Sequence, residues 1–75
     1  MTKIELLECL SRVGEANSAQ VASALGFDYA AAAMALLRLS RQGHVSRALD
    51  PSDGLLWYAL TDRGLDRLAY LKRQR

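Results

Sequence analysis

Apolar residues recur every three or four positions in the first part of the chain, which is the spacing of one helix face. Thr2 and Glu5 stand three positions apart at the start of this pattern, and such a pair forms a capping box in which each side chain satisfies a free backbone N–H of the other residue. The apolar positions that follow are Ile4, Leu7, Leu10 and Val13. Gly14 supplies a stop signal, so we predict a first helix between Thr2 and Gly14.

Two further helices are predicted on either side of a short glycine-containing turn. Asn17 is placed to cap a short helix that ends at Gly26. Asp28 is placed to cap a longer helix over about residues 29–42, which Gly43 closes. Two helices joined by such a turn, with a supporting helix before them, form a helix-turn-helix arrangement.

The longer helix has two chemically different faces when its residues are projected at about 100° each. The face predicted to lie against the core carries Tyr29, Ala32, Ala33, Leu36, Leu39 and Ser40. The opposite face carries Ala30, Ala31, Met34, Arg38 and Arg41. Since three of these five side chains are apolar, the outer face offers charge only through its two arginines.

After Gly43 the period of the pattern changes from 3.6 to 2, which indicates strands. Residues 45–49 and 55–60 are separated by turn-forming residues that include Asp50, Pro51, Asp53 and Gly54. They therefore predict a two-stranded β-hairpin. The alternation in its second strand directs Leu56, Tyr58 and Leu60 toward the core, and Leu55 and Trp57 outward.

A fourth helix is predicted to follow the hairpin directly. Thr61 is placed to cap it, and its basic C-terminal end suits the helix dipole. The residues expected to face inward are Leu65, Leu68 and Leu71. The fold class is therefore mainly α with a small β-hairpin (α+β), in the order helix, helix, helix, hairpin, helix.

The length and composition indicate one folded domain over residues 1–75. Hydrophobic residues make up 51% of the chain and charged residues 24%, a balance typical of a globular protein. The uncharged, alanine-rich stretch of residues 29–37 is far shorter than the roughly 20 apolar residues that span a bilayer. The N-terminus lacks the apolar region of a signal peptide. We therefore expect a cytoplasmic location and no membrane partner.

The sequence offers no set of residues suited to catalysis. Cys9 and His44 are the only cysteine and histidine and belong to different elements, so Cys9 is expected to be a buried or half-buried apolar residue and His44 to cap or pack at the end of the third helix. A glycine-rich phosphate loop, paired carboxylates in an identifiable pocket and a metal-ligand cluster are all missing from the pattern. We expect no enzyme activity, no cofactor and no metal.

Two stretches of the chain carry motifs in a characteristic order. The first runs from Ala22, Leu25 and Gly26 through Leu36 and Leu39 to Gly43 and Val45. The second is residues 58–64, Tyr-Ala-Leu-Thr-Asp-Arg-Gly, at the junction of the hairpin and the final helix. Together they resemble the turn, the third helix and the wing junction of the winged-helix regulators of the MarR, PadR and ArsR kind. The resemblance implies a winged helix-turn-helix fold whose third helix enters the DNA major groove and whose wing touches the neighbouring backbone or minor groove, commonly in a dimer.

The resemblance also implies which residues would contact double-stranded DNA. They are Ala30, Ala31, Met34, Arg38 and Arg41 on the third helix, Arg47 near the base of the wing, and Lys72, Arg73 and Arg75 in the tail. Because base edges are read by hydrogen bonds, the alanine-rich start of the helix predicts weak sequence specificity. Residues 1–71 hold seven basic and eight acidic side chains, so the basic character of the chain lies mostly in its tail, which can also be read as a solvated helix end.

Two functions are left open. One is a DNA-binding transcriptional regulator, and the alternative is a protein-interaction module that kept the scaffold and lost DNA readout. An outward Trp57 and the apolar outer face of the third helix favour the second function. The alternative for Trp57 is cover by the first or the fourth helix. A homodimer is expected through the fourth helix, so the candidate dimer or partner interface consists of Trp57, Leu65, Leu68 and Leu71.

Overall fold

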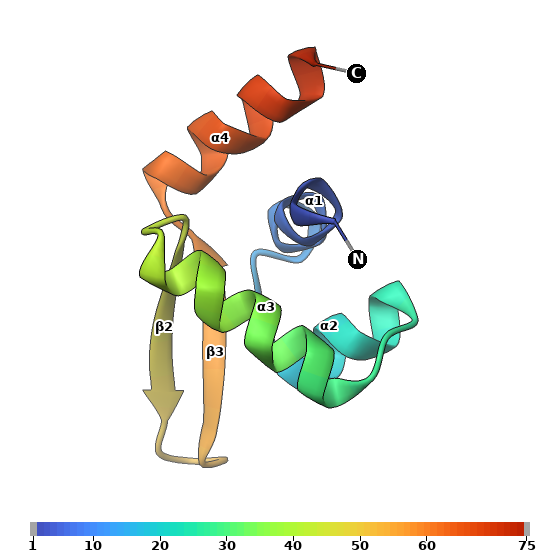
Figure 1. Cartoon of the computed structure of the whole chain (residues 1–75). Helices are drawn as coiled ribbons and strands as arrows, with labels where there is room; N and C mark the ends of the chain where they lie inside the picture. The colour runs from blue at the N-terminus through green and yellow to red at the C-terminus, as the bar shows by residue number, and fades with distance from the viewer. Residues whose placement is uncertain (1, 75) are drawn as a thin grey trace.

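The computed structural model describes residues 2–74, and its elements follow the predicted order with one addition. Figure 1 shows α3 lying across the front of the molecule, the hairpin extending away from it, and α4 beside α1 at the other end. The elements are α1 (Lys3–Val13), β1 (Glu15–Asn17), α2 (Ser18–Leu25), α3 (Tyr29–Arg41), β2 (Val45–Asp50), β3 (Leu55–Leu60) and α4 (Asp62–Arg73).

The helices begin at the capping residues predicted from the sequence, which are Thr2, Asn17, Asp28 and Thr61. The Thr2 and Asn17 caps are complete capping boxes. Asp28 accepts a hydrogen bond from the backbone N–H of Ala31 at 2.7 Å. These local bonds satisfy donors that a helix start leaves free, which explains why the helix boundaries were predictable.

The sheet has three strands rather than the two predicted. The short strand β1 pairs antiparallel with β3, and β3 pairs antiparallel with β2, in the order β1-β3-β2. In this register Ala16 of β1 stands beside Tyr58, and both are buried. Strand β1 therefore ties the link between α1 and α2 to the base of the wing.

The core lies between α1, α2 and α3 and is closed by the base of the sheet and by α4. Its most deeply buried large side chains are Leu7, Leu10, Val21 and Leu36. Cys9 is buried as well, as expected of a small apolar residue. The wing tip and the first turn of α3 extend beyond this core.

Because the wing tip and the first turn of α3 extend beyond the core, two burial predictions are wrong and Trp57 is only half-buried. Tyr29, predicted on the core face of α3, is 61% exposed because it lies in the first turn, past the last core layer. Leu56 is exposed although the alternation directed it inward, because no helix covers the wing at that level. Trp57 is half-buried, and its indole N–H donates to Asp53 of the same wing at 3.0 Å.

Helix α4 docks on α1 through part of its predicted stripe (Figure 1). Leu68 is buried and Leu71 packs against the core. Leu65 is 50% exposed, so its predicted inward orientation is wrong. The reason is geometric, since α4 meets the body along the line of Gly64, Leu68 and Leu71, and Leu65 lies to one side of that line.

The start of α4 is locked to the end of α3 by short polar contacts. The hydroxyl of Thr61 donates to the carbonyl oxygen of Gly43 at 2.6 Å, and the Thr61 N–H donates to the carbonyl oxygen of His44 at 3.1 Å. Gly64 lies directly against the His44 carbonyl group. One threonine thus caps a helix and holds the neighbouring chain, which gives a physical reason for the Thr-Asp-Arg-Gly segment at this junction.

No single helix in residues 2–74 is long and apolar enough to cross a membrane, and α2 and α3 reach the required length and composition only when counted together across a bend of 114°. Within the same residues, no group of three or more His, Cys, Asp or Glu side chains is placed to hold a metal ion.

Candidate nucleic-acid interface

The outer face of α3 is solvent-exposed along its whole length. All five residues assigned to it are exposed, namely Ala30, Ala31, Met34, Arg38 and Arg41. Met34 is 52% exposed at the middle of this face, and the two arginines stand in the C-terminal half. The face therefore presents a convex apolar ridge that becomes cationic toward its C-terminal end.

The N-terminal end of α3 has the opposite charge. The Asp28 carboxylate caps the helix from its exposed N-cap position. Ala30 and Ala31 follow, and neither side chain can donate a hydrogen bond. In the first turn, only methyl contacts are available for reading a base edge, and the nearest charge repels phosphate.

Arg47 is exposed in β2 and stands opposite Tyr58 in the ladder. Since paired residues on antiparallel strands share a face of the sheet, Arg47 lies on the face that carries the buried Tyr58 and meets the helices. Helix α3 packs against β2, so Arg47 lies on the side of the wing that faces the helices.

The acidic residues of the wing tip have a structural role in the turn. Asp50 accepts hydrogen bonds from the backbone N–H and the hydroxyl of Ser52, at 2.9 and 2.7 Å, and these bonds lower the pKa of Asp50 below its usual value. Asp53 accepts from the Leu55 N–H at 2.8 Å and from the Trp57 indole. Both carboxylates stabilise the hairpin, and the negative wing tip is a consequence of that turn.

The tail cations do not join α3 and the wing in one patch. Lys72 and Arg73 are exposed at the C-terminal end of α4, which Figure 1 shows at the opposite end of the molecule from the wing tip. The position of Arg75 lies outside the described residues. Lys72 and Arg73 therefore lie apart from the outer face of α3.

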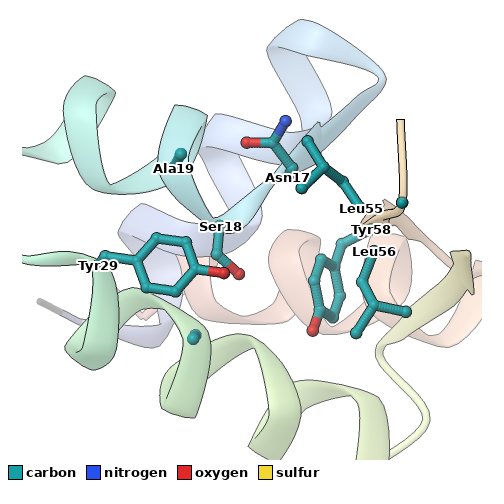
Figure 2. Close-up of a pocket in the computed structure, with 9 residues that line it drawn as sticks. Asn17, Ser18, Ala19, Tyr29, Leu55, Leu56 and Tyr58 are labelled. Atoms are coloured by element: carbon teal, nitrogen blue, oxygen red, sulfur yellow. The ribbon is translucent and has the colours of Figure 1, made fainter. Parts of the chain in front are cut away.

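A small hollow lies between the starts of α2 and α3 and the wing strand β3. Figure 2 shows Tyr29 on one side of it, with Leu56 and Tyr58 on the other. Its volume is about 210 Å³, which is below the roughly 300 to 1,000 Å³ typical of ligand sites. It adds exposed apolar surface next to the first turn of α3.

A second group of cations, which the sequence interpretation missed, surrounds His44. Lys3 of α1 and Arg63 and Arg67 of α4 all lie close enough to act on this imidazole. His44 is 9% exposed, and within the described residues its buried Nδ1 has no hydrogen-bond partner. Burial, and then the three positive charges, lower the pKa of His44 below its usual value. The only local signal in the sequence was the four-residue spacing of Arg63 and Arg67 on one helix face.

Comparisons with known proteins give structural matches only. No protein-family model and no curated protein sequence matches the chain. The PcaV transcriptional regulator of Streptomyces coelicolor superposes with a TM-score of 0.87 and 28% identity, over 93% of this chain and 52% of that one. A MarR family transcriptional regulator from Silicibacter pomeroyi gives 0.83 and 25%, over 96% and 49%.

A third match is a mutant MarR from E. coli in complex with operator DNA, at a TM-score of 0.83 and 22% identity, over 91% of this chain and 49% of that one. The chain thus spans about half the length of each of these regulators. The comparison covers α1 to α4 and the wing, because nearly the whole of this chain is included. The chain is therefore a winged helix-turn-helix domain with the fold of the MarR-type transcriptional regulators.

Proposed function

We propose that this chain is a DNA-binding domain of a transcriptional regulator and that α3 is its recognition helix. The observation that carries the proposal is the fully exposed outer face of α3, with Arg38 and Arg41 on it, in a fold that one solved relative uses in a complex with operator DNA. The apolar first half of the same face supports a mode of binding driven mainly by the DNA backbone.

In this mode the cations position the domain and the apolar residues contribute little selectivity. Arg38, Arg41 and Arg47 contact phosphates at the edges of the major groove, where charge-assisted hydrogen bonds are strongest. Ala30, Ala31 and Met34 lie toward the base edges and can make apolar contact with thymine methyl groups. We therefore expect the domain to bind duplex DNA with little preference for its sequence.

The direct test is binding of the wild-type chain to a random duplex across a salt series. We expect detectable binding at about 50 mM salt, a linear fall of log affinity with log salt, and a slope that reports a few phosphate contacts. A gel shift or fluorescence anisotropy measures this. If no duplex binding is detected at about 50 mM salt, where electrostatic attraction is still strong, the proposal is wrong.

A second candidate function, a protein-interaction module, is favoured by one observation. Large apolar side chains are exposed on the wing and on α3, namely Tyr29, Met34, Leu49, Leu55 and Leu56. Contiguous exposed apolar surface often marks a protein interface. Trp57, by contrast, is held by Asp53 and is better suited to stabilising the wing than to contacting a partner.

We also propose that the chain forms a homodimer through α4, with Leu65 at the centre of the contact. The exposed large apolar residues in the described part of this helix are Leu65 (50%) and Tyr70 (44%), and Leu65 is the more exposed of the two, whereas Leu68 and Leu71 pack inward. We expect the mass of a dimer in sedimentation at about 100 μM, which is above ordinary dimer dissociation constants.

A charged substitution tests whether dimerisation depends on this contact or on exposed apolar surface in general. Leu65→Glu should give a monomer, because a buried unpaired carboxylate is costly. Leu49→Glu, at an exposed leucine of the wing, is the matched control and should remain dimeric. A monomeric wild type, or equal loss in both variants, would rule out the α4 contact.

A further inference from the structure

The cations near His44 come from two helices that are far apart in the sequence. Lys3 lies at the start of α1, and Arg63 and Arg67 lie one turn apart on α4. A shallow hollow between α4 and the end of α3 is lined by His44, Arg63, Asp66, Arg67 and Tyr70. The two guanidinium groups therefore line one depression in the surface, and the ammonium group stands near it.

Neutral groups hold each of these cations in place. The Lys3 ammonium donates to the side-chain oxygen of Gln42 at 2.9 Å. The Arg67 guanidinium lies over the ring of Tyr70, 5.0 Å from its centre. Arg63 lies against the backbone of Gly43, where an added Cβ would come within 3.1 Å of its Nη1. These contacts of the three cations are with neutral groups and leave their charges in place.

The lining of the hollow carries more positive than negative charge. Asp66 is the one carboxylate among the residues that line this hollow. The mutual repulsion is evident in Lys3, whose pKa is lowered by partial burial and then by the charge of Arg67. Like charges held close together at a partly desolvated site are unfavourable unless an anion binds between them.

His44 adds a polar group to the same hollow. Its Nδ1 is buried and has no partner within residues 2–74, although buried polar atoms in folded proteins nearly always have one. The imidazole lines the hollow together with the two arginines. A protonated imidazole can donate to an anion, and the three neighbouring cations disfavour its protonation unless an anion offsets their charge.

We propose that this hollow binds a phosphate-type oxyanion through Arg63 and Arg67, with Lys3 and His44 adding charge and a hydrogen-bond donor. Guanidinium groups suit this ligand because their planar N–H donors match its oxygens. The phosphate has two chemically equivalent sources, the backbone of bound DNA and a free phosphorylated small molecule. This site is separate from the outer face of α3.

The first arm of the test uses inorganic phosphate and the full chain, without DNA. His44 is the only histidine, so its ring signals in NMR report on this site alone. Phosphate added at constant ionic strength, with chloride as the reference, should shift these signals saturably. It should also raise the pKa of His44, because a bound anion offsets the repulsion from Lys3, Arg63 and Arg67 while Asp66 is unchanged.

Single variants of equal charge change provide the control. R63Q and R67Q should each weaken phosphate binding roughly tenfold, the loss expected for one charge-assisted hydrogen bond. R12Q removes an exposed cation from the far end of α1 and should bind phosphate like the wild type. The site is disproved if His44 responds to phosphate no more than to chloride, or if R12Q loses as much affinity as R63Q.

The second arm, which rests on the proposed DNA-binding function, identifies the source of the phosphate. If the DNA backbone occupies the hollow, the R63Q/R67Q variant should bind duplex with a salt slope shallower by roughly two units. If the slope is unchanged while phosphate binding is lost, the ligand is a free phosphorylated molecule. Failure of the wild type to bind duplex would count against the proposed function, and the phosphate arm would still decide on the site.

Discussion

Gly64→Ala is expected to destabilise the domain by about 3 kcal/mol or more, although alanine is the better helix former by about 1 kcal/mol. A Cβ at position 64 would overlap the backbone carbonyl oxygen of His44 and lie 3.0 Å from its carbonyl carbon and 3.2 Å from a methyl group of Leu60. The obstacle is backbone, so it cannot rotate away as a side chain would. Relief requires α4 to move off the end of α3.

Such a movement would break several bonds at once. The His44 N–H donates to Leu39 at 2.9 Å, and the His44 carbonyl accepts from Thr61. Thr61 in turn caps α4 and donates to Gly43. A loss of about 3 kcal/mol is a large part of the stability of a domain this small and should lower the melting temperature by roughly 12 to 24 °C.

Gly54→Ala is the matched control for the clash. Gly54 has a φ of +71°, and an added Cβ would meet nothing within 4 Å. Its substitution should cost only the strain of a left-handed residue, about 1 kcal/mol. Denaturant unfolding of both variants measures the difference. Equal stability of Gly64→Ala and the wild type would mean that the tight approach of α4 to His44 has no energetic importance.

The fold was predictable from sequence where the decisive interaction is local. Asn17 and Gln20 are three residues apart, and their reciprocal bonds, at 2.9 and 3.2 Å, set the start of α2 without help from the rest of the chain. Strand β1 was missed for the opposite reason. Its three residues are too few for their alternation to identify a strand, and they become one only by pairing with residues 57–59, some forty positions away.

The sequence pattern predicted which face of a helix or strand a residue lies on better than it predicted whether that residue is buried. The alternation in β3 correctly placed Tyr58 inward. Leu56, two residues earlier on the same face of the strand, is nevertheless exposed. Period 2 assigns a residue to a face of the sheet, and only the tertiary structure decides whether anything covers that face. The same limit applies to Tyr29 on α3 and Leu65 on α4.

Only part of the candidate site could be predicted from the sequence. The exposed face of α3 follows from helix geometry, so the exposure of Arg38 and Arg41 could be predicted from the sequence. The cationic hollow was not, because Lys3, His44 and Arg63 belong to three segments that only the folded chain brings together. The role of the acidic wing tip also needed the structure, since only the turn bonds show that Asp50 and Asp53 stabilise the hairpin.

Replacing Arg38 and Arg41 together by alanine is expected to weaken duplex binding roughly 100-fold at low salt, about tenfold for each lost charge-assisted contact. The slope of log affinity against log salt should become shallower by roughly two units, at about 0.9 for each phosphate contact. Preference among duplex sequences should change little, because the alanines and Met34 on the same face supply no base-edge hydrogen bonds that could be lost.

Met34→Ala is the matched control, since it alters the centre of the same exposed face without changing charge. If the domain binds DNA mainly through phosphate contacts, this variant should keep the wild-type salt slope and most of the affinity for duplex. For a protein-interaction module, the order reverses: Met34→Ala should cost more partner affinity than the double arginine variant, because apolar contact at the centre of an interface outweighs exposed charge at its rim. An unchanged salt slope after loss of both arginines would show that α3 does not face the phosphates, and the binding surface would then have to be sought around His44 or the wing.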